Sequence, residues 1–271
     1  MALDKNKTTS WIARKRRERG RRALQRQLEY QEKKAASVAA GGQDELARLN
    51  FIRCQQIRQK LEAVRPLHDT DRVLEVGSGS HGLVFGFGNR LGIGVDPLAV
   101  DYKRLFPKLQ NVVPTVAAIG EELPFADRSF DLVLSDNVID HAERPLAILD
   151  ELVRVLRPGG LLYFTVNVHH SLYNAASRLH GAWNAMGLKI ELSAFADHTV
   201  HLTEEQISRV FARLPLKIVE QNSTVISTRA AQRRLKPTNP DAVLKKLFFK
   251  NALFEVVAER QMDTVSTSLS M

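Results

Sequence analysis

The chain has 271 residues, 44% of them apolar and 25% charged, which is the composition of an ordinary globular protein. Its one cysteine, Cys54, excludes an internal disulfide and argues against a cysteine-based metal site. No apolar run reaches the roughly 18 residues that a membrane span requires, and the N-terminus lacks the apolar stretch of a secretory signal. We therefore expect a cytoplasmic protein.

The net charge of +9 is concentrated near the N-terminus. Residues 1–40 contain 12 Lys or Arg against four Asp or Glu, so the rest of the chain is nearly neutral. We therefore divide the chain into a basic arm, residues 1–42, and a domain, residues 43–271. An arm of this charge could touch RNA phosphates, an anionic membrane surface or an acidic patch of a partner. A solvated tail is the alternative, and the oligomeric state stays open.

Two helices are expected before the first strand. Ser10 is a candidate N-cap for a basic helix over residues 10–36, whose apolar stripe is thin. Residues 39–42, Ala-Ala-Gly-Gly, suggest a hinge. Apolar side chains then recur at helical spacing from Leu46 to Val64, which predicts an amphipathic helix that packs on the domain and buries Cys54.

A buried strand over residues 72–77 runs into a glycine-rich loop. Gly77, Gly79 and Gly82 have G-x-G-x-x-G spacing, which in a parallel α/β sheet lets the backbone turn and approach a nucleotide. A second strand, residues 92–96, ends in Asp96, 17 residues after Gly79. This separation is close to the roughly 20 residues expected for a carboxylate that binds ribose hydroxyls. The alternative is a tight turn followed by a solvated carboxylate.

Strands and helices alternate from residue 72, the pattern of a doubly wound parallel α/β sheet. Further strands are expected near residues 112–116, 130–135, 160–167, 216–222 and 252–258, and helices near residues 98–106, 145–156, 203–213 and 240–249. Pro97 and Pro145 suit the first turns of their helices. The breaker Pro158-Gly159-Gly160 should precede the fifth strand, and a basic loop is expected from Arg229 to Lys236.

Residues 168–200 interrupt this alternation with one or two amphipathic helices. They follow the fifth strand at its carboxyl end, where open α/β sheets bind ligands. We therefore interpret them as a helical cap over a substrate pocket. A plain structural insertion is the alternative.

Five segments follow one another in a characteristic order. They are Glu75-Val76-Gly77-Ser78-Gly79, Gly94-Val95-Asp96, Glu121-Glu122-Leu123-Pro124-Phe125, Phe130-Asp131-Leu132-Val133 and Arg154-Val155-Leu156-Arg157-Pro158-Gly159-Gly160. Together they resemble the class I S-adenosylmethionine-dependent methyltransferases, in particular the small-molecule and lipid branch. The resemblance covers about residues 70–167. It implies a Rossmann-like seven-stranded sheet whose last strand is antiparallel, and S-adenosyl-L-methionine as the cofactor.

The resemblance also implies cofactor-binding roles at the ends of the first four strands. Gly77, Gly79 and Gly82 would line the methionine and ribose, Glu75 would order their loop, Asp96 would accept both ribose hydroxyls, Gly120 and Glu121 would flank adenine, and Asp136 would border the methionine end. Ile119 stands where the family often has an acid for the adenine amino group. Glu121, backbone groups or packing would have to substitute for that acid.

Methyl transfer to a hydroxyl benefits from a general base near neutral pH, and histidine suits that task. His141, in the segment after the fourth strand, is the first candidate, and a structural role as a helix cap is its alternative. His169 and His170, after the fifth strand, are the next candidates. No spacing of histidines or acids compels a metal site, so we expect none.

We therefore expect a methyltransferase that acts on a small-molecule or a glycan- or lipid-linked acceptor, at oxygen or nitrogen. The nearly neutral domain and the apolar cap favour such an acceptor. The first alternative is an RNA methyltransferase that grips RNA with the basic arm. A non-catalytic S-adenosylmethionine-binding protein and a dinucleotide oxidoreductase are the others, and the oxidoreductase would have little chain left for a catalytic domain.

Overall fold

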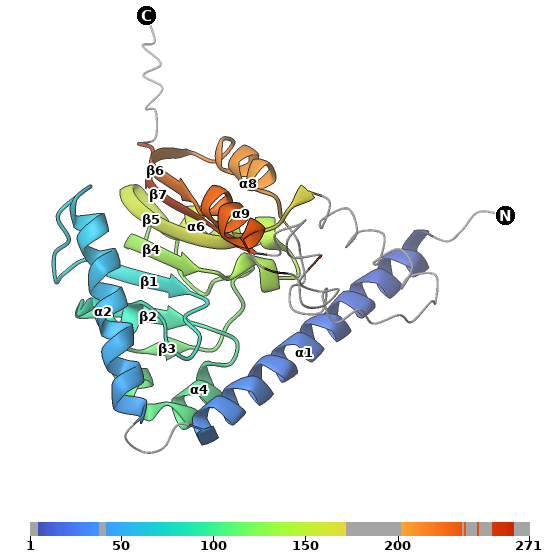
Figure 1. Cartoon of the computed structure of the whole chain (residues 1–271), viewed down its shortest axis with the longest axis horizontal. Coiled ribbons are helices and arrows are strands. Elements are labelled where there is room, and N and C mark those ends of the chain that lie inside the picture. Colours follow the sequence, from blue (N-terminus) through green and yellow to red (C-terminus); the bar gives the residue numbers. More distant parts are fainter. Residues whose placement is uncertain are drawn as a thin grey trace, which may run out of the picture.

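The computed structural model describes residues 5–37, 42–171, 202–234, 236, 243 and 251–262. Within these residues one seven-stranded sheet has the order β3-β2-β1-β4-β5-β7-β6 (Figure 1). The strands are β1 (Arg72–Val76), β2 (Leu91–Val95), β3 (Thr115–Val116), β4 (Phe130–Asp136), β5 (Leu156–Val168), β6 (Leu216–Ser223) and β7 (Ala252–Arg260). The first five strands pair in parallel, and β7 lies antiparallel between β5 and β6. The predicted fold class, with its antiparallel last strand, is confirmed.

Helices cover both faces of this sheet. They are α1 (Lys5–Ser37), α2 (Gly42–Glu62), α3 (Val84–Phe87), α4 (Ala99–Leu105), α5 (Pro107–Gln110), the 3-10 helix η1 (Ile139–His141), α6 (Pro145–Val155), α8 (Glu204–Phe211) and α9 (Val225–Arg233). One apolar cluster joins α6 and α8 to one face, and a second joins α2 and α3 to the other. Alternate strand residues serve the two clusters: Val133 belongs to the first, while Leu132 and Leu134 belong to the second.

The amphipathic helix predicted between Leu46 and Val64 is α2. Its buried stripe consists of Cys54, Ile57 and Leu61, which are 0%, 8% and 0% exposed. Cys54 is therefore a packed helix residue, as the sequence predicted. Each fully buried apolar side chain of this kind contributes about 1.5–3 kcal/mol to folding, so α2 is held firmly on the sheet.

The fifth strand begins earlier than predicted. The expected break at Pro158-Gly159-Gly160 lies inside β5, which starts at Leu156 directly after α6. The pairing of β4 with β5 shifts register between Phe130 and Leu132, and Gly159 has a φ of 72°. A bulge of this kind accommodates proline and glycine within a strand, which is why these three residues did not end it.

Two further boundaries differ from the sequence prediction. Helix α1 begins at Lys5 rather than at Ser10. The stretch predicted as a basic loop from Arg229 to Lys236 is mostly helical, because α9 runs from Val225 to Arg233. Its alanines, arginines and glutamine are good helix formers. Most of the predicted 240–249 helix, residues 39–41 of the hinge and most of the predicted cap lie outside the described residues.

The basic helix α1 runs past the edge of the sheet at which β1, β2 and β4 end (Figure 1). The Ser80 hydroxyl, in the loop after β1, donates to the side-chain oxygen of Gln31 at 3.0 Å. Gly20 lies so close to the Glu143 carboxylate that a side-chain carbon at Gly20 would overlap with it. No helix in the described part of the chain is long and apolar enough to cross a membrane.

Candidate active site

The glycine-rich loop after β1 has a backbone that favours glycine. Gly77 and Gly79 have φ angles of 73° and 54°, a region that residues with a side chain rarely adopt. A side-chain carbon at Gly77 would also overlap with the methyl groups of Val138. The amides of Gly77 and Ser78 donate to the carbonyl of Val95 at 2.7 and 3.0 Å, so the loop is held against the end of β2.

Asp96 meets this loop directly. One carboxylate oxygen accepts from the Gly79 amide at 3.0 Å, and the other accepts from the Leu98 amide at 2.8 Å. Burial raises the pKa of Asp96, and the two amide donors act in the opposite direction. The carboxylate is therefore fixed at the end of β2, beside the glycine loop, where its predicted role requires it.

Glu75 lies below the loop and is 1% exposed. Its carboxylate accepts from the Val84 amide at 2.8 Å, which ties β1 to the start of α3. Gly82 makes room for this carboxylate, because a side-chain carbon at Gly82 would overlap with it. Burial raises the pKa of Glu75 to about 8. This geometry matches the predicted task of ordering the loop.

Several buried polar atoms around the loop have no partner among the described residues. They include the Ser78 hydroxyl and Nε2 of His81. The side chain of Gln110 donates to the carbonyls of Gly79 and Ser80 at 3.0 and 3.1 Å, whereas its oxygen has no such partner. Above Gly79 the nearest heavy atom to a side-chain carbon would be the Gly77 carbonyl oxygen, at 3.9 Å. Open backbone, unpaired polar atoms and a fixed carboxylate fit a ligand that carries hydroxyl and amino groups.

The segment expected to flank adenine is differently engaged. Gly120 packs between Val76 and Ile148, at 3.0 and 3.1 Å from where its side-chain carbon would be. One carboxylate oxygen of Glu121 accepts from the amides of Glu143 and Arg144, at 3.1 and 3.2 Å. Glu121 therefore holds the loop ahead of α6. Ile119, at the departure from the family pattern, is 46% exposed.

Asp136, at the end of β4, forms an ion pair with Arg53 of α2 at 2.5 Å. Its other oxygen accepts from the Thr165 hydroxyl at 2.7 Å. Sequence reasoning missed Arg53, because the place where α2 crosses the sheet depends on tertiary packing. The ion pair fixes the Asp136 carboxylate on the α2 side of the sheet.

A polar cluster joins the ends of β4 and β5. The side-chain amide of Asn167 donates to the side-chain oxygen of Asn137 at 2.6 Å and lies 3.4 Å from the carboxylate of Asp140. Asn137 has a φ of 58°, a left-handed conformation that asparagine tolerates better than most residues. Sequence reasoning missed Asn167. An asparagine at the end of an apolar strand was the available signal.

The histidine candidates lie after the same two neighbouring strands. His141 ends η1, and its side chain lies outside what the structure describes. His169 directly follows β5, is 1% exposed, and donates its backbone amide to the carbonyl of Leu202 at 2.8 Å. His170 is half-buried, and burial lowers its pKa. The backbone therefore brings positions 141 and 169 to one edge of the sheet.

Comparison with known proteins agrees with this geometry. A methyltransferase domain family matches residues 74–164, from β1 to β5. Residues 74–164 therefore have the sequence of a methyltransferase domain. A malonyl-[acyl-carrier protein] O-methyltransferase from Marinomonas sp. (strain MWYL1) is 35% identical over 117 residues, 40% of this chain and 43% of that protein. An uncharacterized methyltransferase from Mycobacterium sp. (strain JLS) is 38% identical over 100 residues, 35% of this chain and 38% of that protein. The matched region thus spans about two fifths of these relatives.

Solved structures share the methyltransferase fold over a larger part of the chain. A putative methyltransferase from Bacillus halodurans has a TM-score of 0.54 at 14% identity, covering 78% of this chain and 99% of that one. A geranyl diphosphate methyltransferase in complex with S-adenosylmethionine has a TM-score of 0.54 at 15% identity, covering 83% of this chain and 92% of that one. At such identities the likeness concerns the fold alone, including strands beyond the matched family segment.

Proposed function

We propose that the chain transfers a methyl group from S-adenosyl-L-methionine to a small-molecule or a glycan- or lipid-linked acceptor, at oxygen or nitrogen. The observation that carries the proposal is the contact of the Asp96 carboxylate with the Gly79 amide, at 3.0 Å. It joins a glycine loop that admits a ligand to a carboxylate suited to ribose hydroxyls, at the carboxyl edge where such sheets bind ligands.

The cofactor supplies an electrophilic methyl group on a sulfonium. Gly77 and Gly79 would let their backbone approach it, while Asp96 would accept the ribose hydroxyls in charge-assisted hydrogen bonds. Glu75 would keep the loop in shape through its bond to the Val84 amide. The backbone of Glu121, rather than its side chain, would border adenine, because its carboxylate already holds the loop before α6.

On the acceptor side, the protein would align a nucleophile in line with the methyl–sulfur bond, which is the main requirement of this chemistry. His141 would take the proton of a hydroxyl acceptor, with His169 as the second candidate. Oxygen is favoured by the relative named for O-methylation of malonyl-[acyl-carrier protein]. The polar cluster around Asn167 would orient the acceptor beside them.

Binding and turnover test the proposal separately. Calorimetry should detect binding of S-adenosylmethionine but not of NAD. Binding of NAD alone would refute the proposal. A screen for tritiated methyl incorporation, comparing extracts with and without the protein, should then reveal the acceptor. Replacing His141 with Ala should slow turnover roughly 10²–10⁴-fold at unchanged cofactor affinity. Full activity would leave His141 a structural role, and the same comparison at His169 would follow.

The basic charge of α1 favours one alternative, an RNA methyltransferase. Tritium incorporated into RNA and lost on deletion of residues 1–40 would support that alternative. Binding of S-adenosylmethionine with no incorporation into any extract fraction would instead support a non-catalytic binding protein. The departure at Ile119 is the sequence feature that motivates this last reading.

A further inference from the structure

Helix α1 has two faces of different character. Residues 20, 24, 28, 31 and 35 lie within about 80° of its circumference at 3.6 residues per turn, and all of them are buried or half-buried. Gln31 on this face accepts from Ser80, and the neighbouring Gln27 bonds to Tyr102 of α4. This docking face fixes the rotation of α1 about its own axis.

The opposite face carries a stripe of positive charge. Arg22, Arg26 and Lys33 lie within about 40° of one another, roughly 180° from the docking face, and span about 17 Å along the helix. Arg22, Arg26 and Lys33 are exposed, and none of these three forms an ion pair with another described residue. Because α1 is docked, the basic stripe must point away from the docking face.

An aromatic ring accompanies the basic stripe. Tyr30 is 61% exposed and lies one turn after Arg26 and one turn before Lys33. An exposed tyrosine between cations offers a surface on which a nucleic-acid base can stack. Arginine, which predominates in the arm, suits phosphate recognition through its planar set of donors.

We infer that the outer face of α1 binds single-stranded nucleic acid, with the basic stripe on the phosphates and Tyr30 against a base. A protein partner would need an apolar centre to its interface, which the basic stripe lacks. A membrane would need an apolar face to insert, but Leu24 and Leu28 lie half-buried on the docking face. Phosphate contacts need neither, and they provide affinity through charge alone.

The same geometry assigns the nucleic acid a role other than methyl acceptor. A strand on the basic stripe lies on the far side of α1 from the glycine loop, separated from it by the helix diameter of about 10 Å. The bound nucleotides are therefore held away from the site. The bound strand would localise the enzyme, whatever its methyl acceptor is.

The first test measures binding of a labelled oligouridylate of about 16 nucleotides as a function of salt. A triple variant, Arg22→Gln, Arg26→Gln and Lys33→Gln, should reduce the slope of log affinity against log salt by about 2. The matched control, Arg209→Gln, Arg213→Gln and Lys217→Gln, removes equal charge from exposed positions on and near α8 and β6 at the far end of the sheet. Equal slopes in the two variants would overturn the proposal.

Tyr30 gives a second readout that does not depend on charge. Tyr30→Ser should weaken oligouridylate binding about 5-fold or more, because one stacked base is lost, whereas Tyr30→Phe should bind like the wild type. Oligothymidylate should also bind, since phosphate and base are shared. Preferential binding to phosphatidylserine vesicles, or displacement of the oligouridylate by equimolar polyglutamate, would overturn the proposal.

The role away from the site has its own outcome. The bound oligouridylate should acquire no tritiated methyl group, and the triple variant should keep the wild-type affinity for S-adenosylmethionine. Methylation of the bound strand would overturn this role and support RNA methylation. Failure to bind S-adenosylmethionine would refute the proposed function and leave the nucleic-acid surface to be judged by the salt slopes.

Discussion

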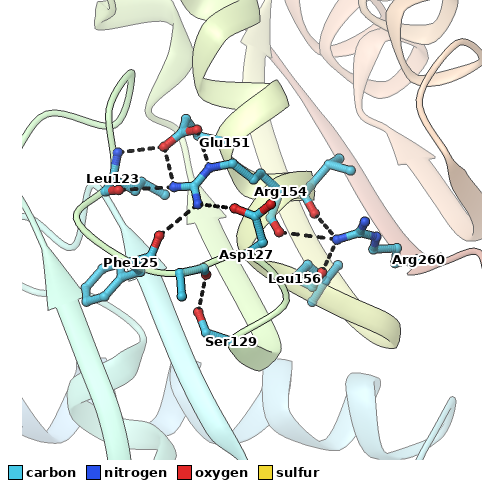
Figure 2. Close-up of polar contacts among 10 residues, drawn as sticks. Leu123, Phe125, Asp127, Ser129, Glu151, Arg154, Leu156 and Arg260 are labelled. Carbon is cyan, nitrogen blue, oxygen red and sulfur yellow. Dashed lines mark hydrogen bonds and ion pairs between the residues drawn. The ribbon is translucent and has the colours of Figure 1, made fainter.

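The polar groups are paired differently at the two ends of the strands, which we call the amino edge and the carboxyl edge of the sheet. At the amino edge of β4 and β5, the Arg154 guanidinium bonds to Glu151 at 2.6 and 2.8 Å and to Asp127 at 2.8 Å (Figure 2). It also donates to the carbonyls of Leu123 and Phe125, at 3.1 and 2.8 Å. One side chain thus joins the loop before β4 to the end of α6.

A second arginine closes the same edge. Arg260, at the end of β7, donates to the carbonyl of Val153 at 2.7 Å and to the carbonyl of Leu156 (Figure 2). These carbonyls belong to the end of α6 and the start of β5, where helix carbonyls lack partners within the helix. At the amino edge, two arginines therefore donate hydrogen bonds to the carboxylates and backbone carbonyls around them.

The carboxyl edge leaves buried polar atoms unpaired among the described residues. They belong to Ser78, His81, Gln110 and Ser135, whereas the amino edge has one such atom, Nε of Arg65. An unpaired buried polar group is costly, so each of these groups calls for a partner such as a ligand or an ordered water. The comparison teaches that one edge stabilises the sheet and that the other is arranged for binding. Substitutions at the two edges should therefore separate stability from affinity.

The largest effect expected from a single substitution is on stability at the amino edge. Arg154→Met removes charged hydrogen bonds to two carboxylates and two carbonyls, and should lower the free energy of unfolding by about 3 kcal/mol. Urea denaturation measures this, and the exposed Arg213→Met should change it by less than about 0.5 kcal/mol. The affinity of the folded Arg154→Met protein for S-adenosylmethionine should stay at the wild-type value. A lost affinity with unchanged stability would contradict the division between edges.

The second effect is on affinity at the carboxyl edge. Asp96→Ala should weaken S-adenosylmethionine binding by about 1.5–3 kcal/mol, the range for hydrogen bonds to a charged group. Calorimetry checks the dissociation constant, with the exposed Glu122→Ala as the control. An unchanged constant would remove Asp96 from the site.

The two edges also differ in how much of their structure could be predicted from the sequence. Parts of the carboxyl edge could be predicted, because the backbone geometry requires glycine at Gly77 and Gly79. Asp96 follows at the spacing expected along one βαβ unit. The amino edge could not be predicted in this way: apart from Glu151, the partners of Arg154 come from a loop almost 30 residues away, and only the fold brings them together. For the same reason the sequence missed Arg53, whose ion pair with Asp136 joins residues 83 positions apart. The predicted start of β5 was wrong, because a bulge accommodates the breaker Pro158-Gly159-Gly160 within the strand.

The pH dependence of stability should sharpen the comparison further. Glu75 has a pKa of about 8 in the folded protein against an ordinary 4.5, so between these pH values the folded state binds the extra proton. The free energy of unfolding should therefore fall as the pH rises from about 5 to 8, by at most about 1.4 kcal/mol per pH unit for one proton.

A glutamine at position 75 isolates this contribution. Glu75→Gln keeps an oxygen for the Val84 amide but cannot titrate, so its stability should fall less steeply over the same pH range. Urea denaturation at several pH values measures the difference, with the exposed Glu122→Gln as the control. Parallel curves for the wild type and Glu75→Gln would show that the Glu75 carboxyl titrates alike in the folded and unfolded states.

The smallest effect concerns the contact through which α1 reaches the carboxyl edge. Gln31→Ala removes the acceptor of the Ser80 hydroxyl and should weaken α1 docking by about 1 kcal/mol. Hydrogen exchange of the α1 amides should then quicken by about fivefold, since 1.4 kcal/mol is a factor of ten. Gln25→Ala is the matched control, because Gln25 is exposed and its hydrogen bond among the described residues runs along the helix, to Glu29 at 3.0 Å. Equal exchange in the two variants would mean that other contacts of the docking face hold α1, and that the glycine loop and the arm are independent.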